Sequence, residues 1–304
     1  MTLCRAVVYQ PGDVIVPSAD GSRKLTVRIS GNPSGIPVFF LHGTPGSRIG
    51  PAPRTPVLYK LGVRLISFDR PGYGGSERQV ARRVADAAED VVAIADYLEV
   101  EQFAVLGRSG GGPHALACAA LLPDRVTRAG VLVSLAPWEG MGAQWLNGMS
   151  ISNRLEYTAA ALEPEKLITR LVQSAAKIKA DPTSHVTMLG REMPEDDRRV
   201  VADAGIRALL AQNFAEALKD SADGWIDDAL AFCAPWGFDP ADIMAPVLLW
   251  HGGDDVFSPV AHTHWLADKI KVSEVVIKPR TAHFGALEAV PWVLSWLIRT
   301  DPVK

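Results

Sequence analysis

One stretch, residues 102–120, constrains the fold of this chain more than any other. Its first half is the kind of short apolar run seen in a buried strand, and its second half is rich in Ala and Leu, as a helix would be. Between the two halves stands G-x-S-x-G, residues 107–111, so the order is strand, tight turn and helix. Such a turn strains the backbone of its serine, and the flanking glycines avoid a steric clash. The pattern predicts that Ser109 presents its hydroxyl at the carboxyl edge of a sheet.

Composition and charge exclude several classes of partner. With 48% hydrophobic and 21% charged residues, the 304-residue chain has the composition of an ordinary soluble globular protein. Its net charge is −3 and it has no long run of Lys or Arg, so nucleic acid and anionic membranes are not expected partners. No apolar stretch reaches the roughly 20 residues that a membrane span needs. We therefore expect a small-molecule substrate as the partner.

The cysteines favour a reducing compartment. Cys4, Cys118 and Cys233 are few, scattered and odd in number, which argues against a disulfide framework. The first nine residues, Met1–Tyr9, lack the charged and apolar segments of a signal peptide. Both observations predict a cytoplasmic protein.

Short strands alternate with helical patterns over most of the chain. This alternation predicts an α/β fold with a mostly parallel central sheet that helices flank on both faces. The pattern stops near Ala136, and residues 137–240 show helical patterns only, including one helix that begins near Glu192 and continues to Leu218. We therefore predict a core domain of residues 1–136 and 241–304, interrupted by a helical cap domain of residues 137–240. The strands are expected at 23–29, 38–41, 64–68, 102–107, 128–134, 246–250 and 273–277, with a helix from Gln79 to Leu98.

A serine nucleophile needs a base to take its proton and an acid to orient that base. His283 follows the last predicted strand and precedes the last helix, which makes it the candidate base. Asp254 and Asp255 end an earlier strand, and we favour Asp255 as the acid, with Glu139 a distant third. The order Ser, Asp, His along the chain is the order found in hydrolases with this kind of serine turn.

The negative charge that develops on a substrate carbonyl oxygen also requires fixed hydrogen-bond donors. The N–H of Gly110, directly after the serine, is one candidate. The other is the N–H of Thr44 in the loop His42-Gly-Thr-Pro-Gly, where His42 is expected to brace the loop. His262 and His264 stand two apart on a predicted helix and point in different directions, which disfavours a shared metal. No metal or cofactor is expected.

Five segments together resemble the α/β-hydrolase fold family, in its capped form. They are His42-Gly-Thr-Pro-Gly, Phe68-Asp-Arg-Pro-Gly-Tyr-Gly-Gly-Ser, Gly107-Arg-Ser-Gly-Gly-Gly, His251-Gly-Gly-Asp-Asp and Thr281-Ala-His-Phe. The resemblance implies Asp255 as the acid, through the pattern H-G-x-x-D. It disfavours epoxide hydrolases and haloalkane dehalogenases, which need an aspartate where Ser109 stands. Proline iminopeptidase activity is discounted because no Trp follows the serine.

These features predict a serine hydrolase that cleaves a small or medium, largely apolar carboxylic ester through an acyl-enzyme. Trp138, Trp145, Trp225 and Trp236 lie in or at the end of the predicted cap and are candidate pocket residues, each of which could equally pack in a core. Arg108 either pairs with an acid or meets an anionic group of the substrate. The alternatives are the same triad acting on a thioester, lactone, amide or C–C bond, and a natural-product cyclase or ligand receptor that reuses the fold.

Overall fold

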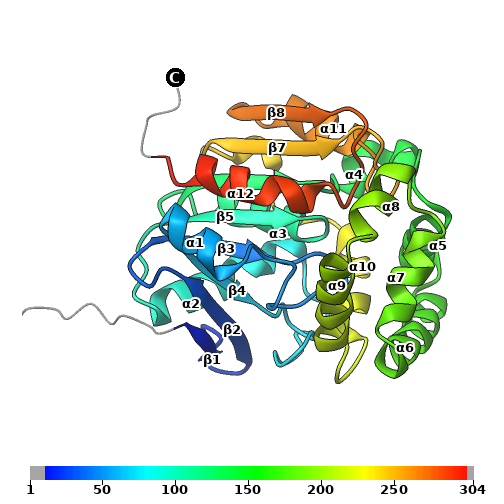
Figure 1. The fold of residues 1–304 in the computed structure, drawn as a ribbon, viewed down its shortest axis with the longest axis horizontal. Helices are drawn as coiled ribbons and strands as arrows, with labels where there is room; N and C mark the ends of the chain where they lie inside the picture. Colours follow the sequence, from blue (N-terminus) through cyan, green and yellow to red (C-terminus); the bar gives the residue numbers. More distant parts are fainter. Residues whose placement is uncertain (1–10, 300–304) are drawn as a thin grey trace, which may run out of the picture.

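The strands form one twisted sheet at the centre of the molecule (Figure 1). The structure is a computed structural model that describes residues 11–299, so the predictions made from Cys4 and from the first nine residues lie outside the described part. Within that part the sheet has eight strands in the order β1-β2-β4-β3-β5-β6-β7-β8. The pairs β1/β2 and β2/β4 are antiparallel, and the remaining pairs are parallel. The strands are β1 (Gly12–Pro17), β2 (Lys24–Gly31), β3 (Ile36–Leu41), β4 (Val63–Phe68), β5 (Phe103–Arg108), β6 (Val126–Leu132), β7 (Val247–Gly252) and β8 (Ser273–Lys278).

Helices cover both faces of this sheet because successive residues of its inner strands point to opposite sides. Phe40 and Leu106 face α1 (Thr55–Leu61) and α12 (Ala286–Leu297). Their neighbours Phe39 and Val105 belong to the core on the other face, which includes residues of α2 (Ala87–Tyr97), α3 (Gly111–Leu121) and α11 (Ala261–Lys269). The predicted α/β class, a mostly parallel sheet flanked by helices, is confirmed.

The chain between β6 and β7 is helical in the structure. Its longer helices lie together beyond the carboxyl ends of the parallel strands, at the right of Figure 1. They have a core of their own, to which Leu167, Leu171, Phe214 and Trp225 contribute. That residues 137–240 form a separate domain stays a prediction. The helices of this segment are α4 (Trp138–Met141), α5 (Ile151–Leu162), α6 (Pro164–Ala180), α7 (Thr183–Gly190), α8 (Glu195–Val201), α9 (Ala204–Ala217) and α10 (Asp223–Cys233).

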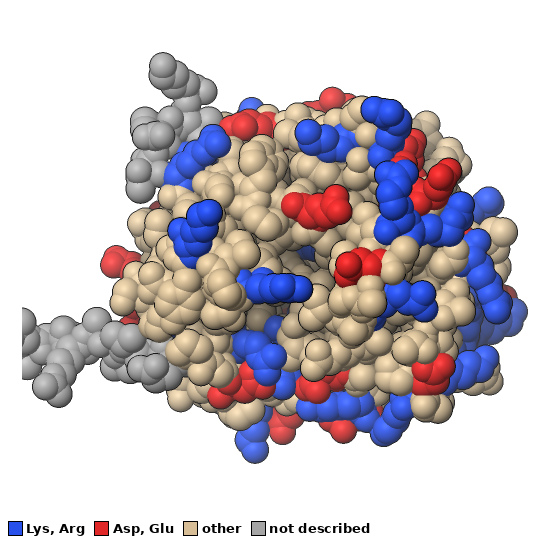
Figure 2. Space-filling model, in the orientation of Figure 1, with Lys and Arg blue, Asp and Glu red and all other residues tan. Residues whose placement is uncertain are grey.

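The surface matches the low net charge of the chain. Figure 2 shows basic side chains interrupted by acidic and uncharged ones over one face, with a hollow near its middle. None of the helices in residues 11–299 is both long and apolar enough to span a membrane.

Two predicted helices are shorter than expected. The helix predicted from Gln79 to Leu98 starts only at α2, after a 3₁₀ turn at Val84–Asp86. Ala81 has a φ of 57°, and Arg82 Nη2 donates a hydrogen bond to Asp228 Oδ1 of α10 at 2.6 Å. These tertiary contacts override the apolar periodicity of the segment.

The helix predicted to run from near Glu192 to Leu218 is also two helices. It breaks between α8 and α9, where the Asp203 carboxylate accepts a hydrogen bond from the Ile206 N–H at 2.9 Å and caps the second helix. The structure also contains a strand that was not predicted, β1, which precedes the first predicted strand. This strand pairs with β2, its neighbour in the chain, at the edge of the sheet.

Candidate active site

Ser109 occupies a sharp turn between β5 and α3. Its φ of 55° lies in the left-handed region, which is unusual for a residue with a side chain. The turn is held by hydrogen bonds from the Ser109 N–H to the Leu132 carbonyl and from the Gly112 N–H to the Ser109 carbonyl, each 2.8 Å long. A Cβ atom at Gly107 would lie 2.3 Å from the Gly111 carbonyl oxygen, so only glycine fits there. The half-buried Ser109 is thereby held at the carboxyl end of β5.

His283 contacts Asp255 in the structure. The Nδ1 atom of His283 lies 2.8 Å from Oδ2 of Asp255, which accepts its proton in a hydrogen bond. Asp254, the alternative acid, is exposed, whereas Asp255 is buried. Glu139 lies in the first turn of α4, in the helical segment. The structure therefore brings Asp255, rather than its neighbour, to the imidazole.

Several donors surround the Asp255 carboxylate. Oδ1 accepts hydrogen bonds from the N–H groups of Phe257 and Ser258 at 2.8 and 3.0 Å, and His251 Nε2 lies 3.3 Å from Oδ2. Burial alone would raise the pKa of Asp255, but His283 and His251 hold it well below its usual value. Asp255 is thus an anion at neutral pH. The contribution of His251 and Ser258 was not predicted, because their distances from Asp255 in the sequence do not reveal the turn that joins them.

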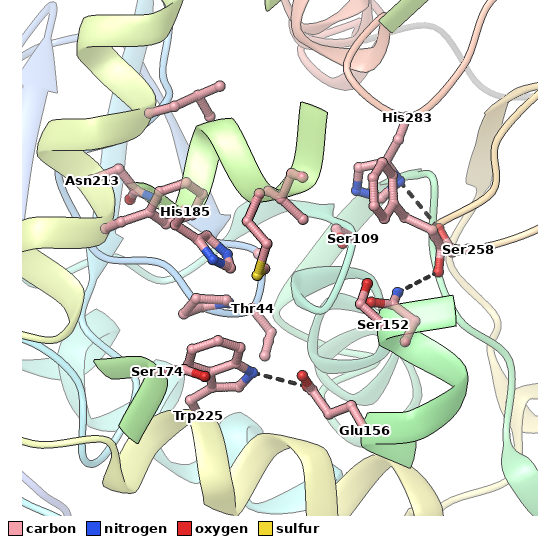
Figure 3. A pocket seen from close by; sticks show the side chains of 18 of the residues that line it. Thr44, Ser109, Ser152, Glu156, Ser174, His185, Asn213, Trp225, Ser258 and His283 are labelled. Atoms are coloured by element: carbon pink, nitrogen blue, oxygen red, sulfur yellow. Dashed lines mark hydrogen bonds between the residues drawn. The ribbon is translucent and has the colours of Figure 1, made fainter. Parts of the chain in front are cut away.

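Ser109 and His283 line the same cavity (Figure 3). No hydrogen bond joins their side chains in the part of the chain that the structure describes. Apart from its contact with Asp255, His283 Nδ1 lies 3.4 Å from the Ser258 hydroxyl. With Nδ1 engaged by the carboxylate, the other ring nitrogen, Nε2, is the one that can accept a proton.

Thr44 and Gly110, whose N–H groups are the two predicted oxyanion donors, lie next to each other. Thr44 lines the cavity, and a Cβ atom added to Gly110 would be 2.2 Å from the Thr44 hydroxyl oxygen. The backbone N–H groups of Thr44 and Gly110 donate to no protein acceptor within residues 11–299. Both amides are therefore available to an incoming oxygen atom.

A buried ionic network that the sequence did not predict holds the Thr44 loop. Asp228 of α10 accepts hydrogen bonds from the Thr44 hydroxyl (2.5 Å), Arg70 Nη2 (2.5 Å), the Tyr73 hydroxyl (2.9 Å) and Arg82 Nη2 (2.6 Å). Burial favours the neutral form of Asp228, but the two guanidinium groups keep its pKa well below the usual value. Sequence alone offered one signal, the arginine in Asp69-Arg-Pro-Gly, but gave no indication of its partner.

Another acid of the helical segment holds the His283 loop. The carboxylate of Asp197, in α8, accepts hydrogen bonds from the N–H groups of His283 (3.1 Å) and Phe284 (2.6 Å). Asp197 is fully buried. The loops that carry Thr44 and His283 are therefore both fastened to helices between β6 and β7.

The predicted tryptophans divide between the cavity and the core. Trp225 lines the cavity and donates a hydrogen bond from Nε1 to Glu156 Oε1 at 2.9 Å (Figure 3). Trp145 and Trp236 are buried in the core beside the sheet, and Trp138 packs against that core. These three are not among the residues that line the cavity, and they follow the alternative of packing in a core. Each has apolar neighbours that cover its ring; Trp145, for example, packs at 4.8 Å between ring centroids against Tyr157.

Polar side chains make up much of the cavity wall. Burial raises the pKa of Glu156 to about 7, although the hydrogen bond from Trp225 favours the carboxylate. Burial lowers the pKa of His185 to about 4, so its ring is neutral at neutral pH. Arg108, at the end of β5, also lines the cavity. Further polar lining residues are Ser152, Asn153, Arg170, Ser174 and Asn213.

His42 and His262 have structural partners. His42 Nδ1 donates to the Gly43 carbonyl (2.7 Å), and its Nε2 accepts from the Arg70 N–H (3.2 Å), as expected for a residue that braces the loop. His262 Nδ1 accepts from the Ala136 N–H at 3.0 Å, while His264 is exposed. Among the described residues, no group of three or more His, Cys, Asp or Glu side chains is arranged to hold a metal ion.

Comparison with known proteins places these features in a family. Residues 36–290 match the model of a family described as "alpha/beta hydrolase fold". A solved structure, the enol-lactonase from Burkholderia xenovorans LB400, superposes with a TM-score of 0.68 over 94% of this chain and 98% of its own, at 18% identity. At that identity the likeness concerns the fold alone.

Two curated relatives are similar in sequence. The first is the dihydrolipoyllysine-residue acetyltransferase component of an acetoin cleaving system from Pseudomonas putida, 28% identical over 90% of this chain and 65% of its own length. The second is epoxide hydrolase B from Mycobacterium tuberculosis, 36% identical over 38% of this chain and 33% of its own length. The chain therefore spans less than two thirds of either relative.

Proposed function

Because the chain belongs to the alpha/beta hydrolase fold family, we propose that it is a serine hydrolase that cleaves a carboxylic ester through an acyl-enzyme. The observation that carries the proposal is the 2.8 Å contact between His283 and Asp255 beside a cavity that Ser109 also lines. The positive φ of Ser109 supports it, because a strained turn of this kind presents a nucleophile to substrate.

In the proposed reaction, His283 Nε2 takes the proton of Ser109 as Oγ bonds to the carbonyl carbon of the ester. The carbonyl oxygen gains the negative charge and is held by the N–H groups of Thr44 and Gly110. When the intermediate collapses, the bond to the alcohol oxygen breaks and His283 returns the proton to that oxygen. Water then attacks the acyl-enzyme, with His283 as base, and releases the acid and the free serine.

Asp255 is the proposed orienting acid. Its carboxylate accepts the Nδ1 proton of His283, which leaves Nε2 unprotonated toward the cavity and stabilises the imidazolium that forms during the reaction. Its own orientation is fixed by the N–H groups of Phe257 and Ser258. The carboxylate therefore does not have to reorganise as the charge develops.

The cavity favours a substrate that is more polar than the apolar ester predicted from the sequence. Glu156, Arg170, Ser174 and Asn213 contribute polar atoms to its wall, and Trp225 and Phe214 contribute rings. A few polar groups among apolar ones are what fixes the orientation of a small ligand. We propose a small-molecule ester with hydrogen-bonding groups as the partner.

A fluorophosphonate probe and one variant test this function. The probe is expected to label Ser109, as identified by peptide mass spectrometry, and Ser109→Ala is expected to abolish both labelling and turnover of nitrophenyl esters. Ser295→Ala is the matched control, because that hydroxyl bonds only to the Pro291 carbonyl of its own helix. Full turnover in Ser109→Ala, or labelling confined to another serine, would contradict the proposal.

A further inference from the structure

Arg108 is a buried cation without a charged partner. Its side chain belongs to a residue only 6% exposed, and its Nε and Nη2 atoms are buried with no hydrogen-bond acceptor. None of the carboxylates in residues 11–299 lies within ion-pair distance of its guanidinium. One face of the guanidinium packs on the Phe284 ring, 5.4 Å from the ring centroid. Stacking of this kind leaves the N–H groups at the edge of the guanidinium free to donate.

Two acids, Asp197 and Asp255, interact electrostatically with Arg108, but both already have other partners. Asp197 accepts from the backbone of His283 and Phe284, and Asp255 accepts from His283 and from two backbone amides. Burial of the unpaired guanidinium lowers the pKa of Arg108 to about 10, so it still carries its charge at neutral pH. A buried charge without a counter-ion is strongly unfavourable, so the site is suited to receive an anion from outside the chain.

The guanidinium lies close to the proposed reacting atoms. A Cβ atom added to Gly43, next to Thr44, would be 3.5 Å from Ser109 Cβ and 3.7 Å from Arg108 Nη1. Gly43, Ser109 and Arg108 all line the cavity. An anionic group a few bonds from the carbonyl carbon that Ser109 attacks would therefore be within reach of the guanidinium.

We propose that Arg108 binds a carboxylate of the substrate, so that the preferred ester carries a carboxylate on a short acyl chain. This inference rests on the proposed ester hydrolysis. A carboxylate matches the planar fork of guanidinium N–H donors and can accept two hydrogen bonds at once. Nη1, the guanidinium nitrogen near Gly43, would be the first donor to meet this carboxylate, while the buried Nε and Nη2 atoms have no acceptor in residues 11–299.

A pair of substrates of nearly equal size tests the proposal. Nitrophenyl hemisuccinate differs from nitrophenyl butyrate in having a carboxylate where the butyrate chain has its terminal methyl. The wild-type enzyme is expected to show a higher kcat/KM for the hemisuccinate. Arg108→Met should lower the ratio of the two kcat/KM values by roughly 10- to 100-fold, the effect of losing hydrogen bonds to a charged group. Arg108→Lys should give an intermediate ratio, because it retains the charge without the fork.

Arg128→Met is the matched control. Arg128, on the neighbouring strand β6, is also a buried arginine over an aromatic ring, that of Trp296, but it does not line the cavity. The Arg128→Met substitution should leave the ratio of the two kcat/KM values unchanged. Because a ratio is measured, loss of activity that is common to both substrates cancels.

The outcomes separate the two proposals. If the wild-type enzyme hydrolyses both esters through Ser109 without preferring the hemisuccinate, or if Arg108→Met leaves the ratio unchanged, the carboxylate site is wrong while the serine hydrolase stands. Turnover of either ester by Ser109→Ala would overturn the hydrolase proposal instead. Should Arg108→Met fail to fold, the wild-type enzyme decides: succinate must inhibit butyrate ester hydrolysis competitively and more strongly than succinamide, and equal inhibition would overturn the carboxylate site.

Discussion

The hydroxyl of Thr44 donates a hydrogen bond to the carboxylate of Asp228, with 2.5 Å between Oγ1 and Oδ2. Thr44 lies in the loop after β3, and Asp228 lies in α10, 184 residues further along the chain. Arg70 Nη2 contacts both, at 3.1 Å from Thr44 Oγ1 and 2.5 Å from Asp228 Oδ2. The amide proposed to bind the oxyanion is thereby positioned by a helix outside the sheet.

Asp197 gives the His283 loop the same kind of support from α8. Two of the proposed catalytic groups thus depend on buried carboxylates of the helices between β6 and β7. Since electrostatic stabilisation requires donors that are fixed before the reaction, we expect these helices to contribute to the proposed chemistry through the two loops that they hold.

Asp228→Asn should reduce both stability and turnover. The substitution leaves the buried Arg70 and Arg82 without a counter-charge, and breaking a buried ion pair destabilises a protein by about 3–5 kcal/mol. We expect kcat to fall about 10-fold or more with a smaller change in KM, because a displaced Thr44 amide weakens binding of the transition state more than that of the substrate. Urea unfolding and steady-state kinetics measure the two effects.

Asp227→Asn is the control for this prediction, since Asp227 is the adjacent residue of α10 and pairs with Arg78, which is exposed. It should change kcat little. Thr44→Val removes only the hydroxyl, so it reports on the same contact if Asp228→Asn does not fold. A fall in stability with unchanged kcat in both Asp228→Asn and Thr44→Val would show that the network is structural only.

Asp255→Asn should lower kcat by about 10³- to 10⁴-fold, because an amide in place of the carboxylate favours the wrong tautomer of His283. Asp254→Asn should retain turnover within a few-fold, since Asp254 is exposed. Esterase kinetics with the two purified variants measure the difference. Equal losses in both, or a larger loss in Asp254→Asn, would reverse the assignment of the acid.

Local sequence patterns predicted the sheet well, because its inner strands are short apolar runs whose bounds are set by turns. The serine turn was also predictable, since Gly107 and Gly111 stand where a side chain would collide with backbone. The residues favoured Asp255 over Asp254 without excluding Asp254, the family pattern added support, and the structure shows why the residues alone left the choice open. Both follow β7, and only the turn decides that Asp255 is buried against His283.

Long-range ion pairs were beyond sequence reasoning. Nothing in the pattern around Arg82 indicates that it reaches Asp228, yet this contact belongs to the stretch where the predicted helix fails. Which aromatic side chains line the cavity was also beyond sequence reasoning. Trp145 and Trp225 look alike in the sequence, and packing of the helices alone decides that Trp225 faces the cavity and Trp145 the core.

Gly110→Ala should impair turnover, whereas an alanine at a glycine with open space around it should not. The added Cβ atom would lie 2.2 Å from the Thr44 hydroxyl oxygen and 3.1 Å from a ring carbon of Phe232, so the Thr44 loop has to move. We expect kcat to fall by about 10²-fold, as for loss of one oxyanion donor. Gly190→Ala, at a helix position with open space, should leave kcat unchanged and stabilise the protein by about 0.5–1 kcal/mol. Wild-type kcat in Gly110→Ala would show that the two loops need not be in contact.

Glu156 should make stability depend on pH between about 4.5 and 7. Burial raises its pKa from 4.5 to about 7, so in this interval the unfolded chain has released a proton that the folded protein still holds. The free energy of unfolding therefore falls by about 3 kcal/mol as the pH rises through this interval, and it levels off above it. Glu156→Gln cannot ionise and should lose this part of the pH dependence. The stability of this variant relative to wild type should therefore be higher above about pH 7 than below about pH 4.5. Urea unfolding of both proteins across the interval measures it, with the exposed Glu165→Gln as a control that follows wild type. Parallel curves for wild type and Glu156→Gln would show that the carboxyl group ionises at the same pH in the folded and unfolded chain.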